Sequence, residues 1–275
     1  MGAMEQPPTA PTCYRHHGRT TYLSCSDCGK PICVDCSVDS PVGQKCPDCA
    51  AQRGTARIIT GRQLRARNAS IPPVTMFLMG SSILVYVLGA LSPQLNNTIF
   101  ENFALWPQDV QNGSWWLLIT TAFLHSGLMH IMFNMWALYI LGPGIERQVG
   151  SLPFAGLYLA SALLGSVAYV AFNSGPAVGA SGAVFGLFGA WLASSWRARH
   201  SVAGRSQLQS IGVILGINLL LPLAVPRIAW EAHVGGLVAG FVIAYAWTRL
   251  AKDERARSII AFGVAAVALV LGLIV

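Results

Sequence analysis

Apolar residues dominate the chain beyond Pro73, where they form seven segments separated by short polar stretches. A helix needs about 20 mostly apolar residues to cross the hydrocarbon core of a bilayer. The pattern therefore predicts seven transmembrane helices. They cover residues 74–91, 127–141, 152–172, 178–193, 208–225, 232–250 and 258–275.

The predicted loop between the first two helices, residues 92–125, contains no Lys or Arg. Its Trp106, Trp115 and Trp116 suit the membrane–water interface, where an indole ring keeps its polar edge in water. Because the apolar run 115–141 is too long for one untilted span, we expect residues 115–124 to lie in the interface. The second helix would then begin near Gly127.

Composition agrees with an all-α polytopic membrane protein. The chain is 53% hydrophobic and 11% charged, and its mean hydropathy is +0.52, too apolar for an ordinary soluble domain. The formal charge of +7 then reflects topology rather than nucleic-acid binding, because membrane proteins collect Lys and Arg in their cytoplasmic loops.

Basic residues fall almost entirely on one side of the predicted helices. If the N-terminus is cytoplasmic, thirteen Lys and Arg residues lie in the cytoplasmic linker and loops, against Arg227 alone in the outer loops. This asymmetry predicts a plasma-membrane protein with its N-terminus in the cytoplasm and its C-terminus outside. Residues 1–50 contain no recognisable secretory signal. The thirteen are Arg53, Arg57, Arg62, Arg65, Arg67, Arg147, Arg197, Arg199, Arg205, Arg249, Lys252, Arg255 and Arg257.

Residues 53–72 form a basic linker that precedes the first predicted helix. Such a run suits a solvated segment that lies on the anionic headgroups of the cytoplasmic leaflet. Nucleic-acid binding is the weaker interpretation, and we predict no nucleic-acid partner.

All seven cysteines lie between residues 13 and 49, and together with one histidine they form four pairs with two intervening residues. Four pairs supply eight soft ligands, the number that two tetrahedral zinc sites require. Disulfides would need an oxidising compartment and an even number of thiols, so zinc is the better interpretation. The pairs are Cys13 with His16, Cys25 with Cys28, Cys33 with Cys36, and Cys46 with Cys49. His17 could replace His16, and the spacing does not decide between them.

The spacing resembles that of B-box-type zinc modules. The cross-braced order of such modules implies that the Cys13/His16 pair shares a metal with Cys33/Cys36, and the Cys25/Cys28 pair with Cys46/Cys49. Residues 1–52 are too few to bury much of a core, so the two ions would supply most of the folding free energy. We predict a structural or docking module with a cytoplasmic protein partner, because it has no open coordination position for catalysis.

Four polar residues fall at one depth of the predicted helices, near the outer surface: His130, Asn134, Ser181 and His233. Gly179-Ala180-Ser181-Gly182 alone is typical of a helix-packing face, and a lone His is typical of a packing residue. Four such groups at one depth favour a shared wet cavity, because isolated polar groups in a membrane are costly.

Acyl transfer is the chemistry that fits these groups. Ser181 would be the nucleophile and His233 the general base. Glu231 points to another face of the helix, so no carboxylate completes a triad. The backbone N–H of Ser181, the Asn134 amide and the His130 ring are candidates to stabilise the oxyanion.

The chain resembles the rhomboid intramembrane serine proteases over residues 73–275. The resemblance rests on His125-x4-His130-x3-Asn134, on Gly179-x-Ser181-Gly182 and on Ala232-His233-x2-Gly236-x3-Gly240. It implies six core helices plus a seventh, and a Ser181–His233 dyad that cleaves transmembrane proteins near their outer ends. It also implies that His130 and Asn134 assist the oxyanion, and that Gly236 and Gly240 bring the sixth helix close to the fourth. His125 would be structural or line the site.

Two positions depart from the family pattern. A Trp-Arg pair of the first loop is replaced by Trp116-Leu117, and an aromatic hydroxyl beneath the histidine is replaced by Phe185. Neither change removes a proton-transfer or oxyanion group, so we expect activity with no cofactor in catalysis. A silent client-binding protein is the alternative, although both dyad residues are present. A transporter would spread polar residues through the bilayer, which this chain does not do.

Overall fold

The computed structural model describes residues 10–39, 43–52, 71–224 and 228–275. The chain divides into two compact units, residues 1–69 and 70–275. Residues 53–70 of the predicted linker and Arg227 of the predicted outer loop lie outside the described residues.

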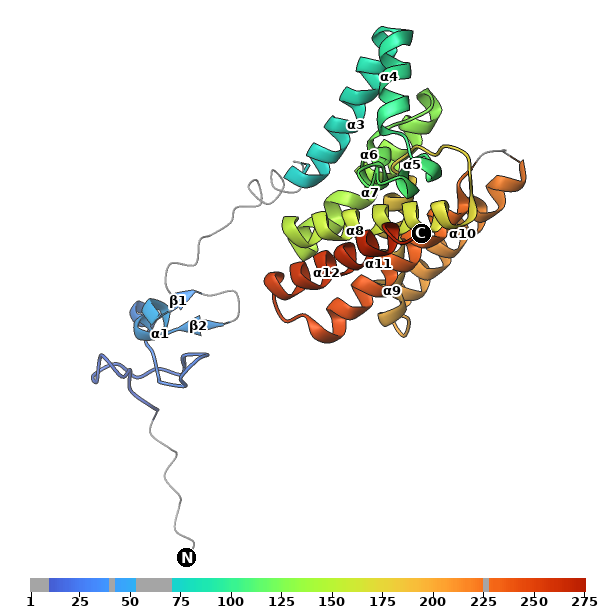
Figure 1. The fold of residues 1–275 in the computed structure, drawn as a ribbon. Helices are drawn as coiled ribbons and strands as arrows, with labels where there is room; N and C mark the ends of the chain where they lie inside the picture. The colour runs from blue at the N-terminus through green and yellow to red at the C-terminus, as the bar shows by residue number, and fades with distance from the viewer. Residues whose placement is uncertain (1–9, 40–42, 53–70, 225–227) are drawn as a thin grey trace, which may run out of the picture. The chain divides into compact units, whose positions relative to one another are not determined.

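The N-terminal unit is built from short elements around its cysteines (Figure 1). They are the 3-10 helix η1 (Val34–Cys36), the antiparallel strands β1 (Val38–Asp39) and β2 (Gln44–Lys45), and the helix α1 (Pro47–Gln52). Its buried hydrophobic cluster contains Ile32 and five cysteines. So small a core cannot offset the entropy cost of ordering the segment, which is consistent with a metal-dependent fold.

The second unit is a bundle of helices, and each predicted apolar segment contains one (Figure 1). The long helices are α3 (Pro73–Leu91), α7 (Leu128–Val149), α8 (Ser151–Phe172), α9 (Ser181–Arg197), α10 (Val202–Ala224), α11 (Trp230–Leu250) and α12 (Glu254–Gly272). Within the described residues, α3, α7, α8 and α12 are long and apolar enough to cross a membrane. The all-α membrane fold is thus confirmed, and the count of seven crossings stays a prediction.

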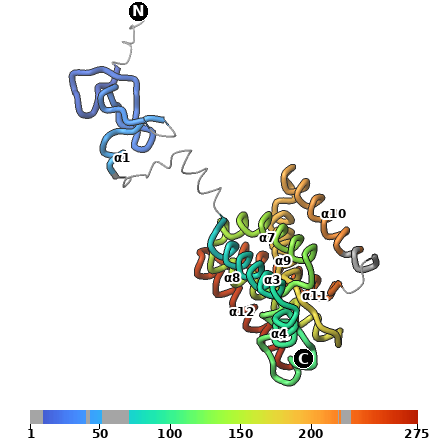
Figure 2. The backbone as a smooth tube through the Cα atoms, turned by 90° about the horizontal axis from the view of Figure 1, so that it is seen from above, coloured from blue at the N-terminus to red at the C-terminus, as the bar shows by residue number. Residues whose placement is uncertain are grey.

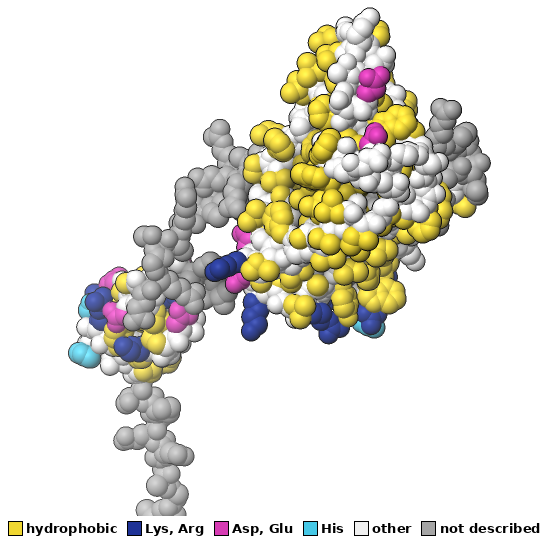
Figure 3. All heavy atoms as spheres, viewed as in Figure 1, with side chains coloured by type: hydrophobic (Ala, Val, Ile, Leu, Met, Phe, Trp, Pro, Cys, Tyr) yellow, Lys and Arg dark blue, Asp and Glu magenta, His cyan; other side chains and the backbone are white. Residues whose placement is uncertain are grey.

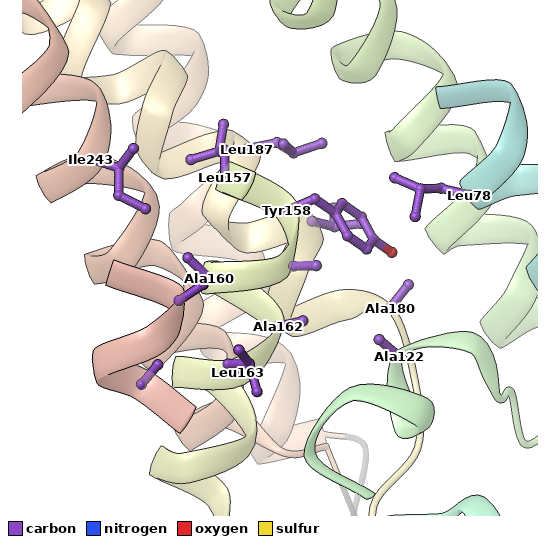
Figure 4. Packing of buried hydrophobic residues seen from close by; sticks show 14 of the residues in the cluster. Leu78, Ala122, Leu157, Tyr158, Ala160, Ala162, Leu163, Ala180, Leu187 and Ile243 are labelled. Atoms are coloured by element: carbon purple, nitrogen blue, oxygen red, sulfur yellow. The ribbon is translucent and has the colours of Figure 1, made fainter. Parts of the chain in front are cut away.

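Helix α8 lies at the centre of the bundle, where it packs against α9, α11 and α12. Its side chains Phe154, Leu157 and Leu163 are almost fully buried. Figure 4 shows Leu157 beside Leu187 of α9, and Leu163 further along α8. Helix α10 packs against α9 at the edge of the bundle (Figure 2). The packed central helices therefore form a rigid frame for side chains that lie at their ends.

Helices α9 and α11 approach each other through glycines. A Cβ at Gly236 would overlap the carbonyl oxygen of Gly182, and a Cβ at Gly240 would overlap that of Gly186. Small residues of this kind let two helix backbones come into contact inside a membrane. The role predicted for Gly236 and Gly240 agrees with this geometry.

Helix α7 extends well beyond the predicted end of its segment at residue 141. Gly142 and Pro143 are typical of a helix end, but both are buried within α7. One turn later, Glu146 is 1% exposed and accepts hydrogen bonds from the N–H groups of Val74 and Thr75, at 3.0 and 2.8 Å. The carboxylate caps α3, and this contact with a distant segment favours continuing α7.

The first loop contains helices that the hydrophobic pattern did not predict. They are α4 (Pro93–Phe103), α5 (Pro107–Gln111), α6 (Leu117–Thr120) and the 3-10 helix η2 (Thr121–Phe123). Trp115 and Trp116 are exposed, as an interfacial position requires. Leu117 and Leu118 are instead buried, and Ser166 of α8 donates to the Leu118 carbonyl at 2.9 Å. Part of the segment 115–124 therefore packs into the bundle, and its position in the membrane interface stays a prediction.

Candidate functional site

Ser181 and His233 meet at the N-terminal ends of two adjacent helices. Ser181 is the first residue of α9, and His233 lies in the first turn of α11. The His233 Nε2 atom lies 2.9 Å from the Ser181 Oγ atom, a normal hydrogen-bond distance. The glycine contacts between α9 and α11 place these residues, which are distant in the sequence, at this separation. A hydroxyl so paired with an imidazole has the geometry for general-base activation.

The loop before Ser181 is fixed by backbone contacts with the first loop. Leu105 and Ala177 exchange two N–H···O bonds of 3.0 and 2.9 Å, and the Gly179 N–H donates to the Thr121 carbonyl at 3.0 Å. Gly179 has φ of +131°, a conformation that favours glycine. Leu105, Thr121 and Ala177 were missed by the sequence analysis, because irregular loop residues carry no periodic signal.

His130 enters the site from α7. Its Nδ1 atom lies 3.1 Å from the Ser126 hydroxyl, while its Nε2 atom would be 2.7 Å from a Cβ at Gly179. The Ser181 Oγ atom would be 3.7 Å from that same Cβ. His130 and Ser181 thus flank the Gly179 backbone. The His125 ring meets His130 edge to face, with a centroid separation of 5.1 Å.

Asn134 lies one turn further along α7 and is buried. Its Nδ2 donates to the His130 carbonyl at 2.9 Å, which fixes the amide plane. The Nδ2 atom carries two N–H groups, and the second one has no hydrogen-bond partner within the described residues. A preorganised amide donor of this kind is suited to an oxyanion.

Phe185 supports the His233 ring in place of a hydrogen-bonding side chain. The two rings are stacked, with centroids 4.1 Å apart and planes inclined by 8°. Within the described part of the chain, no carboxylate is hydrogen-bonded to His233. The stacking orients the imidazole from below, while its edge faces Ser181.

A small cavity adjoins the nucleophile. Its volume is about 30 Å³, and Thr121, Ser166 and Tyr169 line it together with Ser181. This volume is enough for a water molecule, and the hydroxyls would supply the polar partners that such a water needs.

The N-terminal unit gathers the predicted ligands into two clusters. One contains Cys13, His16, Cys33 and Cys36, the other Cys25, Cys28, Cys46 and Cys49, and the ligand atoms of each lie within 4.8 Å of one another. The His16 Nδ1 atom is 3.3 Å from the Cys33 sulfur and 3.4 Å from the Cys36 sulfur. The structure thus brings His16, and not its neighbour His17, into the cluster. Four nitrogen and sulfur donors at this spacing fit tetrahedral zinc.

The pKa values of the thiols differ within the second cluster, which contains Cys25 and Cys49. Hydrogen bonding from the backbone of Cys46 lowers the pKa of Cys25 to about 6, which favours its thiolate. Hydrogen bonding to the Cys46 side chain raises the pKa of Cys49 to about 12. Four thiols this close cannot all ionise without a compensating charge, and a divalent cation provides one.

Comparison with known proteins matches both units. A rhomboid domain model matches residues 112–250, and a B-box zinc finger model matches residues 8–40. The rhomboid protease GluP of Bacillus subtilis is 33% identical over 204 residues, which are 72% of this chain and 40% of that protein. RHOMBOID-like protein 6, mitochondrial, of Arabidopsis thaliana is 35% identical over 62% of this chain and 51% of its own length. Rhomboid-like protease 1 of Toxoplasma gondii is 34% identical over 58% of this chain and 56% of its own length.

The chain therefore spans about half the length of these relatives. Both resemblances drawn from the sequence are confirmed, since the rhomboid model spans all three quoted motifs and the B-box model spans the ligand pairs between Cys13 and Cys36. The B-box match ends at residue 40, before Cys46 and Cys49. The four apolar helices and the family together indicate an integral membrane protein. Because the rhomboid domain model covers half of the chain, this protein belongs to the rhomboid family.

Proposed function

We propose that this protein is an intramembrane serine endopeptidase that uses Ser181 and His233 as a catalytic dyad. The observation that carries the proposal is the 2.9 Å separation of the Ser181 Oγ and His233 Nε2 atoms. The names of the relatives support it, since GluP and the Toxoplasma protein are called rhomboid proteases.

The reaction proceeds by acyl transfer in two steps. His233 takes the proton of Ser181 as the oxygen attacks a substrate carbonyl, and then gives that proton to the leaving amine as the peptide bond breaks. The resulting acyl-enzyme ester is hydrolysed when His233 takes a proton from water and returns it to Ser181. Phe185 keeps the imidazole in one plane through both steps, a task that a carboxylate performs in a triad.

The oxyanion is stabilised by three groups around Ser181. The Ser181 N–H lies at the N-terminus of α9, where backbone donors lack partners within the helix. The His130 ring of α7 lies against Gly179, two residues before Ser181, and Asn134 lies one turn further along α7. Donors fixed before the reaction stabilise developing charge at little reorganisation cost.

The substrates are transmembrane proteins, cut near their extracytoplasmic ends. This follows from seven crossings with a cytoplasmic N-terminus, which place the starts of α9 and α11 near the outer surface. The distribution of Lys and Arg supports that orientation and a plasma-membrane location. Water then reaches Ser181 from the extracytoplasmic side, and catalysis requires no cofactor.

The N-terminal unit holds two structural zinc ions and recruits a cytoplasmic protein. The two donor clusters support the metal sites, with His16 as the imidazole ligand. When bound, each ion supplies the cross-link that holds segments of this small unit together. The full ligand set leaves no open position, so the ions take no part in proteolysis.

Cleavage of a model transmembrane substrate in vesicles tests the dyad. Ser181→Ala and His233→Ala should each lower the rate by at least about 10³-fold, because either change removes proton transfer. Ser210→Ala and His200→Ala change the same residue types at exposed positions and should cut at the normal rate. A fluorophosphonate should label the wild type and the two controls, but not Ser181→Ala.

The client-binding alternative predicts that the wild type does not cleave the substrate. A silent rhomboid-like protein would cut no substrate and resist fluorophosphonate labelling while still capturing transmembrane segments. Unchanged cleavage in either dyad variant would instead disprove the assigned roles of Ser181 and His233.

A further inference from the structure

A second cavity lies at the opposite ends of the helices that carry the dyad. Its volume is about 440 Å³, and it is lined by residues of α7, α9 and α11 and by Arg257 of α12. Ser194 of α9 and Trp247 of α11 line it. At 1.5 Å per residue, these positions lie roughly 20 Å along the helices from Ser181 and His233. The cavity is therefore distinct from the proposed active site.

The walls of this cavity are mainly apolar and aromatic. Ile140, Trp191, Ala244 and Trp247 form much of the lining. Polar groups are fewer, and they come from the ends of the helices, as Gln148, Ser194, Thr248 and Arg257 do. Such a division suits a ligand with a long hydrocarbon portion and a polar head.

Arg257 places a cation at the polar rim. The Trp247 Nε1 donates to the Arg257 carbonyl at 2.9 Å, which fixes the backbone of this residue beside the cavity. The Arg257 Nη1 atom approaches the carbonyls of Gln148 and Val149 at only 3.5 and 3.4 Å. Its Nε and Nη2 atoms have no hydrogen-bond partner within the described residues. The guanidinium can therefore bind a phosphate through these donors.

The surroundings match a membrane surface rather than an aqueous cleft. Trp136, Tyr139 and Ile140 of α7 are more than half exposed, which suits contact with hydrocarbon. Lys and Arg side chains gather at one end of the helical unit, below a surface that is largely hydrophobic (Figure 3). Arg249 lies in the last turn of α11, Lys252 in the loop that follows, and Arg255 in the first turn of α12, two residues before Arg257. The predicted topology makes this the cytoplasmic leaflet, where anionic lipids concentrate.

We propose that this cavity binds one anionic phospholipid of the bilayer. An acyl chain occupies the apolar part beside Trp191 and Ala244, and the phosphate rests on Arg257. A soluble peptide is a poorer fit, because the lining offers few groups to pair with its backbone. Because the lipid touches α7, α9 and α11 far from Ser181, its binding does not depend on the proposed proteolysis.

Gly144 permits a direct test. It lines the cavity, and nothing lies within 4 Å of a Cβ built there, so the side chain of Gly144→Leu should project into the cavity without strain. Gly80→Leu is the matched control, since Gly80 is also a helical glycine with open space around its Cβ and lies in α3. Arg257→Gln removes the charge and leaves the apolar walls intact.

Lipid retention by the full-length chain would be measured by native mass spectrometry. The protein would be equilibrated with mixed vesicles of equal phosphatidylglycerol and phosphatidylcholine, then extracted gently in dodecyl maltoside. We expect one retained phosphatidylglycerol, and at least about a fivefold loss in Gly144→Leu, whose added side chain takes space that the acyl chain would occupy. In Arg257→Gln the preference for phosphatidylglycerol should fall about fivefold, as expected for one basic residue.

Three results would overturn the proposal. They are equal retention of the two lipids by the wild type, equal retention by Gly144→Leu and Gly80→Leu, and displacement of the lipid by the detergent alone. Thermal unfolding of each variant identifies any loss caused by misfolding, and a folded Gly144→Leu that still retains the lipid counts against the site.

Discussion

The contact between α9 and α11 and the clusters of the N-terminal unit both bring distant side chains within a few ångström, but they use opposite means. In the bundle, the lack of side chains at Gly236 and Gly240 lets the backbones of α9 and α11 touch, so that His233 reaches Ser181. In the N-terminal unit, side chains from four short segments converge on two points with almost no apolar core around them. Catalytic geometry in the first region therefore depends on volume, and order in the second depends on metal.

Adding a single methyl group at Gly240 is the strongest test of whether close backbone contact positions the dyad. Alanine favours a helix over glycine by about 1 kcal/mol, so propensity alone would make Gly240→Ala neutral or stabilising. A Cβ there would instead overlap the Gly186 carbonyl and push α11 away from α9. A shift of about 1 Å between reacting groups costs about 10²-fold in rate, and we expect a loss of that order in cleavage of a model substrate.

Gly263→Ala provides the control for that experiment. Gly263 lies in α12 with nothing within 4 Å of a Cβ, so the same substitution should leave the rate unchanged. Equal cleavage by the two variants would show that close backbone contact does not position the dyad.

Zinc content tests the other side of the comparison. Metal analysis of the purified wild type should give about two zinc ions per chain. His16→Ala should reduce that content by about one ion, because it removes one of four ligands from the first cluster. His17→Ala should retain both ions, since His17 lies outside both clusters. Loss of zinc from His17→Ala alone would reverse this ligand assignment.

Chelation should affect the two regions unequally. Limited proteolysis after treatment with a strong chelator should cut residues 1–52 rapidly, because metal binding supplies their folding free energy. Cleavage of substrate should persist, since the bundle is held by packing. Simultaneous loss of activity would mean that the N-terminal unit is more than a docking or stability element.

The sequence predicted those features whose cause is local. Apolar runs of membrane length gave the position of each long helix, and Cys-x-x-Cys spacing gave the ligand pairs. Features caused by contacts between distant residues were not foreseen. Helix α7 continues through Pro143 because Glu146 caps α3, and the Ser181 loop is tied to Thr121 and Leu105. His16 and His17 are adjacent residues of one type, so only the structure of the turn that orients them shows which one joins the cysteines.

The smallest expected effect concerns Phe185, whose ring orients His233 by packing and without a hydrogen bond. Its ring is stacked on His233 at 4.1 Å, and an aromatic contact of this kind contributes about 1 kcal/mol. Phe185→Leu keeps an apolar side chain but loses the flat face, so kcat should fall about threefold to tenfold with KM nearly unchanged. Phe185→Tyr retains the face and should stay near the wild-type rate. If Phe185→Leu is as active as Phe185→Tyr, the α9–α11 contact orients the imidazole without help from the ring. A loss in both variants would instead indicate that His233 needs the flat face and that the added hydroxyl of tyrosine does not fit beneath it, which would extend the dependence on packing from the glycines to the aromatic side chain.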